Sequence, residues 1–196
     1  MSLADRIDAA RDRWDVLRHP FYTRWERGEL TRPELAFYAG EYRHAVVALA
    51  DAAATAGDPQ HAREEAEHVD LWDAFAGALE APLDREPTPE TNLCATAWAR
   101  SDPLEALAVL YAVESAQPAI AETKLRGLVE HYGFAPDSSG TEYFTVHAER
   151  DKEHARAAKA QLAQVAPEDE GRLAAAAEEA LRGNWRLLDG VERAAA

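Results

Sequence analysis

The sequence predicts an all-α fold, a bundle of about seven helices in a single domain over residues 1–196. Alanine, leucine, glutamate and arginine dominate the chain, and these residues are strong helix formers. No segment shows sustained alternation of apolar and polar residues with β-branched side chains, so we expect no β-sheet. The turns are short, which places sequential helices beside each other in an up-down bundle.

Capping residues mark the starts of several helices. Thr31 and Glu34 form the pattern of a capping box before the second helix. The pairs Asp58-Pro59 and Asp102-Pro103 each combine an N-cap side chain with proline at the first helical position. We therefore predict helices over residues 3–17, 31–56, 59–80, 90–100, 103–132, 141–165 and 168–191.

Residues that interrupt helices mark the ends. They are the RHPF turn near 18–21, Gly57-Asp58, the proline-containing stretch 82–89, Ser101-Asp102, the segment 133–140 and Pro167. Pro118 falls inside the helix predicted over 103–132, and it has no N–H to bond the carbonyl of residue 114. We therefore expect this helix to be kinked beside Glu114.

The charge and composition exclude several classes of partner. The formal net charge is −15, which argues against nucleic acid or an anionic membrane surface as the main partner. No run of 18 apolar residues could span a membrane, and the charged N-terminal stretch lacks the apolar core of a signal peptide. We expect a cytoplasmic protein. Cys94 is the single cysteine, so no internal disulfide can form.

The helix predicted over 141–165 carries a candidate metal-binding stripe. His147, Asp151 and His154 stand at positions i, i+4 and i+7, so they share one face. Imidazoles and a carboxylate are suitable ligands for iron, manganese or zinc. The same spacing is equally typical of an ordinary solvated helix face, so this stripe alone decides nothing.

A second candidate cluster lies on the helix predicted over 59–80. Glu65 and His68 form a Glu-x-x-His unit, which carboxylate-bridged di-metal bundles use. Glu64 is an alternative carboxylate, and His61 lies on roughly the same stripe. The sequence therefore leaves the first ligand open among these three residues.

Glu114 is a lone acid in an apolar helix, and it completes the set. A buried carboxylate without a partner is costly, and a metal ion would provide that partner. Three histidines and three carboxylates suit two divalent ions, with Glu114 expected as the bridging carboxylate. The predicted ligands are Glu65, His68, Glu114, His147, Asp151 and His154.

These motifs resemble those of the heme-oxygenase-like di-metal oxidases and oxygenases, in the TenA/PqqC-like superfamily. The matching stretches are LRHPFYTRWERGELTRPELAFYAGEY, EEAEHVDLWDAFAGAL, LYAVESAQPAIAETKLRGLVEHYGF and EYFTVHAERDKEHARAAKAQL. The family's H-x3-D-x2-H motif falls on His147, Asp151 and His154, and its central glutamate falls on Glu114. The resemblance implies a seven-helix heme-oxygenase-like bundle whose two iron ions, or one iron and one manganese, activate O2 with electrons from an external reductant.

The resemblance also implies catalytic residues. Some relatives make p-aminobenzoate from one of their own tyrosines, with a lysine of the protein as amino donor. By motif, these positions fall on Tyr22 and Lys124. Two departures concern the metal site: a family glutamate seven residues before the histidine falls on His61, and a tyrosine before the central glutamate is Val113.

Other functions remain open at this point. A di-metal oxygenase could act on an external amino acid or fatty acid. Metal-free enzymes with this fold include thiamin-salvage hydrolases and a quinone-cofactor oxidase, and a protein-interaction module is the non-enzymatic alternative. Related bundles commonly dimerise, so a homodimer is one oligomeric state that the resemblance implies.

Overall fold

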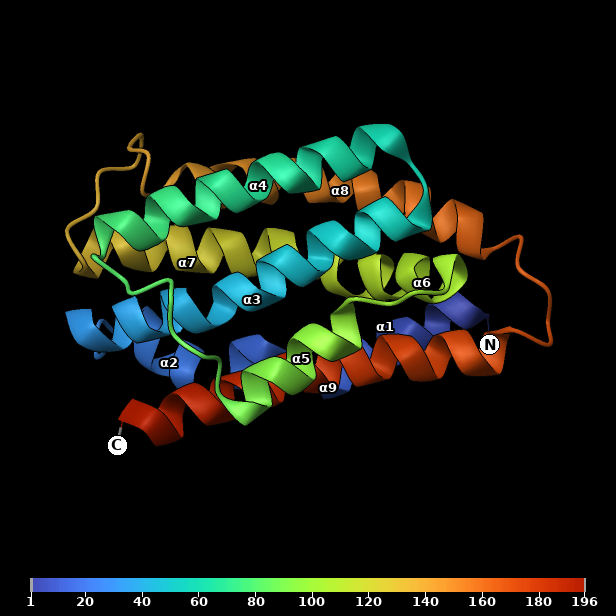
Figure 1. The fold of residues 1–196 in the computed structure, drawn as a ribbon, viewed down its shortest axis with the longest axis horizontal. Helices are drawn as coiled ribbons and strands as arrows, with labels where there is room; N and C mark the ends of the chain where they lie inside the picture. The colour runs from blue at the N-terminus through green and yellow to red at the C-terminus, as the bar shows by residue number, and fades with distance from the viewer. Residues whose placement is uncertain (1, 196) are drawn as a thin grey trace.

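Helices make up all the regular secondary structure in the computed structural model, which describes residues 2–195 (Figure 1). The all-α prediction is therefore confirmed. A short 3₁₀ helix, η1 (Val16–Arg18), precedes α2. The α-helices are α1 (Leu3–Arg13), α2 (Pro20–Glu26), α3 (Arg32–Ala56), α4 (Pro59–Ala78), α5 (Pro89–Trp98), α6 (Pro103–Glu114), α7 (Gln117–His131), α8 (Glu142–Leu162) and α9 (Glu170–Ala195).

The prediction of about seven helices is wrong, because the described residues form nine α-helices. The RHPF sequence is not only a turn: Pro20 occupies the first position of α2, and the His19 ring accepts a hydrogen bond from the N–H of Phe21 at 3.1 Å. This capping starts a short helix that the turn signal concealed.

The second additional helix comes from a break rather than the expected kink. The region 103–132 divides into α6 and α7, with Ser115 and Ala116 between them. Pro118 occupies one of the first two positions of α7, where its missing N–H leaves no hydrogen bond unmade. The break places Glu114 at the last position of α6, so its side chain projects from a helix end.

The capping predictions are confirmed by hydrogen bonds. The Thr31 hydroxyl accepts from the N–H of Glu34, and the Glu34 carboxylate accepts from the N–H of Thr31, which completes a capping box at α3. Asp58 caps α4 and Asp102 caps α6, each ahead of a proline. Local sequence therefore determines where these three helices begin.

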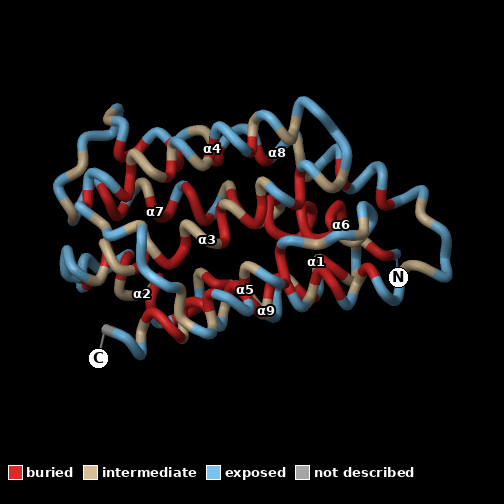
Figure 2. The backbone as a smooth tube through the Cα atoms, in the orientation of Figure 1, coloured by how far each residue is buried: buried red, intermediate tan, exposed pale blue. Residues whose placement is uncertain are grey.

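Helix α3 runs through the middle of the bundle and packs against α4, α5, α6 and α9. On one long side of the molecule, α4 lies beside α8, and α8 also packs against α6 and α7 (Figure 1). Buried backbone follows the inward faces of these helices (Figure 2). No helix of the described chain combines the length and apolar character needed to cross a membrane.

The core is unusually aromatic. Its largest fully buried side chains include Trp25, Trp72 and Trp98, and each indole N–H donates to a main-chain carbonyl: Lys124 at 3.1 Å, Ala39 at 2.8 Å and Ala180 at 3.0 Å, respectively. Buried aromatic side chains contribute large apolar areas while these hydrogen bonds satisfy their polar atoms. The carbonyl of Lys124 thereby ties α7 to α2.

Gly127→Ala should destabilise the bundle where α7 meets α2. A Cβ at Gly127 would lie 2.6 Å from Cδ1 of Trp25, a rigid buried ring that cannot move aside cheaply. Overpacking of this kind costs about 1–3 kcal/mol in the free energy of unfolding, which urea denaturation measures. Gly77→Ala on α4, where nothing lies within 4 Å, should instead be neutral or stabilising by up to about 1 kcal/mol. Equal effects of the two substitutions would contradict this account.

Candidate metal centre

Three helices bring seven potential metal-binding side chains together in the core. Helix α4 supplies His61, Glu65 and His68, α6 ends at Glu114, and α8 supplies His147, Asp151 and His154. The buried members are nearly inaccessible, whereas the side chains of His61 and His154 retain 13% and 14% of their exposure. The cluster is therefore sealed except at these two histidines.

The first donor group consists of Glu65, His68 and His147, whose candidate ligand atoms all lie within 4.8 Å of one another. Nδ1 of His68 lies 2.9 Å from Oε1 of Glu65, and the rings of His68 and His147 are 4.2 Å apart. Nδ1 of His147 lies 2.7 Å from the carbonyl oxygen of Tyr143, so this nitrogen donates and Nε2 is left as an acceptor for an ion.

The second donor group consists of His61, Glu65, Glu114 and His154, within the same mutual distance of 4.8 Å. Nε2 of His61 lies 2.8 Å from Oε1 of Glu114 and 3.7 Å from Oε1 of Glu65. The rings of His61 and His154 are 4.0 Å apart. Glu65 belongs to both groups, whereas Glu114 belongs to the second group alone, and the bridging role expected for Glu114 stays a prediction.

Asp151 belongs to neither group, although it is fully buried beside them. Burial raises the pKa of Asp151 well above its usual value, and the neighbouring charges of Glu114 and Glu65 raise it further. Burial likewise raises the pKa of Glu114, with a contribution from Glu65. A positive ion near these carboxyl groups would remove the cost of ionising them.

The polar atoms of the cluster fit a metal site because they lack other partners. An unpartnered buried polar atom costs about 1–3 kcal/mol, and a folded protein rarely leaves several together. Close pairs such as His61 with Glu114 approach without hydrogen-bond geometry, as two ligands of one ion do. The unpartnered atoms are Nε2 of His61, Oε1 of Glu65, Nδ1 of His68, both carboxylate oxygens of Glu114 and Asp151, Nε2 of His147 and Nδ1 of His154.

The donor types also suit iron or manganese. Imidazole nitrogens and carboxylate oxygens are the ligands that these ions prefer. Burial and the neighbouring His68 lower the pKa of His147 to about 4, so its imidazole is neutral at physiological pH and free to bind a cation.

The sequence contains a pattern that groups His61 with Glu65 and His68. The α4 motif H-x3-E-x2-H, at His61, Glu65 and His68, has the spacing of the α8 motif H-x3-D-x2-H. The contact of His61 with His154, and of His68 with His147, shows that the two helices meet in antiparallel register. Glu64, the third open alternative, belongs to neither donor group.

A chamber of aromatic side chains surrounds Tyr22 and Lys124. The hydroxyl groups of Tyr22 and Tyr38 are hydrogen-bonded at 2.8 Å. Nζ of Lys124 lies 5.2 Å from the centre of the Tyr22 ring and 4.5 Å from that of Tyr42. Burial lowers the pKa of Lys124 well below its usual value, so the amine tends toward its neutral, nucleophilic form.

Aromatic contacts connect this chamber to the metal-binding cluster. The ring of Tyr143 stacks on His147 at 3.9 Å, and Tyr143 contacts Trp72 at 4.8 Å. Trp72 contacts Tyr38 at 6.0 Å, and Tyr38 is hydrogen-bonded to Tyr22. The sequence-predicted residues Tyr22 and Lys124 therefore lie together, and the rings of Tyr38, Trp72 and Tyr143 lie between Tyr22 and the cluster.

A family model described as iron-containing redox enzyme matches residues 31–189. The chain belongs to this family. The 4-aminobenzoate synthase of Chlamydia muridarum is 32% identical, over 96% of this chain and 89% of its own length. The 4-aminobenzoate synthase of Nitrosomonas europaea is 33% identical, over 95% of this chain and 89% of its own length. Family membership and these relatives identify the chain as an oxidoreductase.

Solved structures agree on the fold. A Shewanella denitrificans domain described as having a heme oxygenase-like fold superimposes with a TM-score of 0.79 at 21% identity, covering 100% of this chain and 94% of that chain. A TenA homologue from P. horikoshii OT3 superimposes with a TM-score of 0.76 at 17% identity, covering 98% of this chain and 99% of that chain. The heme-oxygenase-like fold expected from the sequence is therefore confirmed.

Lys124→Met should stabilise the fold in a pH-dependent way. Because the folded-state pKa of Lys124 lies below its unfolded value of 10.5, the buried amine costs most at low pH and nothing once pH exceeds 10.5. The gain in unfolding free energy should therefore shrink as pH rises toward 10.5, as chemical denaturation across a pH series will measure. Lys152→Met, at an exposed position on α8, is the control and should change stability by less than about 0.5 kcal/mol. A pH-independent gain at Lys124 would contradict its lowered pKa.

Proposed function

We propose that this oxidoreductase holds two iron ions, or one iron and one manganese, and uses O2 to form p-aminobenzoate from its own Tyr22. The observation that carries the proposal is the pair of donor groups that share Glu65. Three carboxylates, Glu65, Glu114 and Asp151, would offset most of the charge of two divalent ions. Histidines at both ends complete a set suited to iron or manganese.

When bound, the ions would supply a place for O2 to bind and electrons for its reduction, and an external reductant would restore those electrons. Side chains of the protein itself exclude water and orient Tyr22. The sealed core excludes water, since Tyr22, Lys124 and the inner ligands are almost fully buried. The hydroxyl of Tyr38 shares a hydrogen bond of 2.8 Å with the hydroxyl of Tyr22 and so orients the Tyr22 phenol within the core.

The self-derived substrate is supported by the residues beside Tyr22. The relatives named 4-aminobenzoate synthase match nearly the whole chain. Tyr22 would provide the aromatic ring, and the neutral amine of Lys124 beside it would provide the nitrogen. The aromatic contacts from His147 through Tyr143 and Trp72 give a short path between the ions and this ring.

An external small molecule is the second candidate substrate, and one cavity favours it. A hollow of about 250 Å³ opens at the break between α6 and α7. Val113 and Ser115, the neighbours of Glu114 in the chain, line it, and so do the buried amides of Gln117 and Asn184. A small amino acid would suit this polar lining better than a fatty acid would.

Metal loading provides the first test. Metal-free protein reconstituted with Fe(II), or with Fe(II) and Mn(II), should bind about two ions per chain by elemental analysis. Glu65→Ala removes the shared ligand and should reduce loading at both positions. Glu67→Ala, at an exposed position on the same helix, is the control and should load like the wild type. Fewer than about one ion per wild-type chain would favour a metal-free enzyme instead.

Mass spectrometry tests the self-derived substrate. Protein exposed to Fe(II), reductant and O2 should release p-aminobenzoate in a single turnover, with a matching mass change at Tyr22. Protein grown with ¹⁵N-labelled lysine should give labelled product. Tyr22→Phe should abolish product, whereas Tyr132→Phe, outside the chamber, should not. An intact Tyr22 with no product released from metal-loaded protein would leave the external substrate as the better account.

A further inference from the structure

One end of the metal-binding cluster opens to solvent through a hollow. This hollow, of about 570 Å³, lies between the N-terminal part of α4 and the C-terminal half of α8. His61 and His154 line it, and these are the cluster members with residual exposure. Glu64 lines the same hollow, directly beside the shared ligand Glu65 in the chain.

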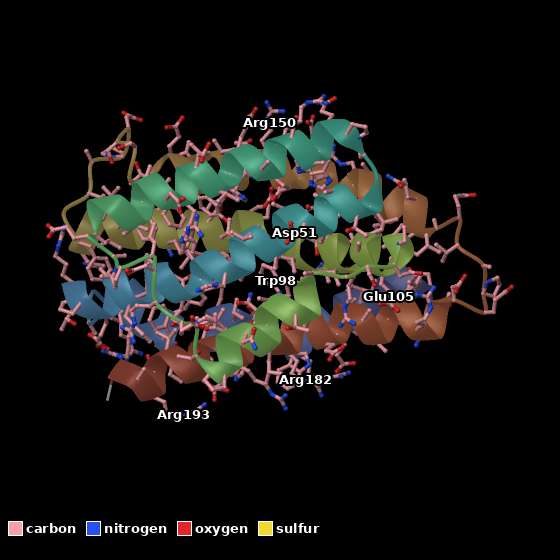
Figure 3. All side chains as sticks on the ribbon, viewed as in Figure 1. Asp51, Trp98, Glu105, Arg150, Arg182 and Arg193 are labelled. Atoms are coloured by element: carbon pink, nitrogen blue, oxygen red, sulfur yellow. The ribbon has the colours of Figure 1, made fainter. Side chains whose placement is uncertain are left out.

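Both carboxylate oxygens of Glu64 already have partners. Oε2 lies 2.9 Å from Nε2 of His154, and Oε1 accepts a hydrogen bond from the side-chain amide of Gln60 at 3.0 Å. Arg150, labelled in Figure 3 at the outer edge where α8 runs beside α4, lies 3.8 Å from Oε1. By contrast, both oxygens of Glu114 and of Asp151 have no hydrogen-bond partner. Glu64 thus differs from the candidate ligands in having its contacts satisfied by protein.

The contact with Glu64 determines which nitrogen of His154 can bind an ion. A neutral imidazole has one N–H and one lone pair. The carboxylate can only accept, so Nε2 of His154 carries the proton toward Glu64. Nδ1 is then the lone-pair nitrogen, and it is the buried atom of this ring that has no partner.

We propose that Glu64 is a positioning residue that fixes the tautomer and orientation of His154, so that Nδ1 faces the ion at the open end of the cluster. This inference rests on the proposed metal-dependent function. Carboxylates that accept from a metal-bound histidine are known to raise its basicity and to hold its ring.

The opposite end of the cluster supports this role by contrast. There, Nδ1 of His147 donates to the main-chain carbonyl of Tyr143, which leaves Nε2 for an ion. The two histidines of the α8 motif therefore use opposite ring nitrogens, and each is held by an outer acceptor. At the buried end, the acceptor is the main-chain carbonyl of Tyr143, which no side-chain substitution removes. At the open end, the acceptor is the side chain of Glu64. Glu64 is consequently the outer contact through which the affinity of one ion alone can be changed.

Titration of metal-free protein with Co(II) tests the proposal, with visible absorption reporting the ligands around each ion. The wild type should bind two Co(II) per chain. Glu64→Ala should still bind two, with one bound about 10–100-fold more weakly and with an altered spectrum. Glu64→Gln keeps an oxygen that can accept from Nε2–H, so it should recover most of the affinity. Glu153→Gln, at an exposed residue lining the same hollow, is the matched control and should behave like the wild type.

Two results would overturn the role of Glu64. Loss of one bound Co(II) in both Glu64 variants would indicate that Glu64 is a direct ligand. Wild-type affinity and spectrum in Glu64→Ala would show that Glu64 does not position the ring of His154. A metal-independent readout separates this inference from the proposed function. Long-range ¹H–¹⁵N NMR of the metal-free protein should find His154 protonated at Nε2, and Glu64→Ala should lose that preference. The expected tautomer in a chain that binds no Co(II) would contradict the proposed function while keeping the Glu64 contact.

Discussion

Burial of three carboxylates among apolar helices is the constraint on which the rest of this structure depends. Glu65, Glu114 and Asp151 lie in a core whose aromatic and alanine side chains offer them no cation. Ionised carboxyl groups in such surroundings are costly, as the raised pKa values of Glu114 and Asp151 reflect. Four histidines converge on the same region, so the natural counter-charge is a metal ion rather than a lysine or arginine.

The helix break between α6 and α7 positions one of these three carboxylates, Glu114. A continuous helix through 103–132 would hold Glu114 within a regular helical face. The interruption at Ser115 and Ala116 instead makes Glu114 a terminal residue, facing α4 where it meets His61. Pro118 removes the N–H that would have bonded the carbonyl of residue 114, which makes the break inexpensive. One backbone irregularity thus places the central carboxylate between the two histidine-bearing helices.

Lys124, a buried amine in the same core, responds to burial in the opposite direction. Lys124 has no carboxylate beside it and is surrounded by aromatic rings, including those of Tyr22, Tyr38 and Tyr42. Burial therefore lowers the pKa of Lys124, whereas burial raises the pKa of Glu114 and of Asp151. Trp72 and Tyr143 lie between the buried amine of Lys124 and the candidate metal ligands.

The sequence by itself determined the helical class, the capped starts of α3, α4 and α6, and most of the ligand types. These properties are local, because caps, propensities and one-face spacings depend on residues within a few turns of each other. Periodicity shows which side chains share a helix face, but it does not show which faces meet. For that reason the sequence predicted Glu65 as a ligand but left His61 and Glu64 open as alternatives.

Only the tertiary structure separated those three residues. The antiparallel register of α4 and α8 pairs His61 with His154 and His68 with His147, gives Glu65 to both donor groups, and turns Glu64 outward onto His154. Long-range packing decided the arrangement of the site because its residues come from three helices that no local pattern connects.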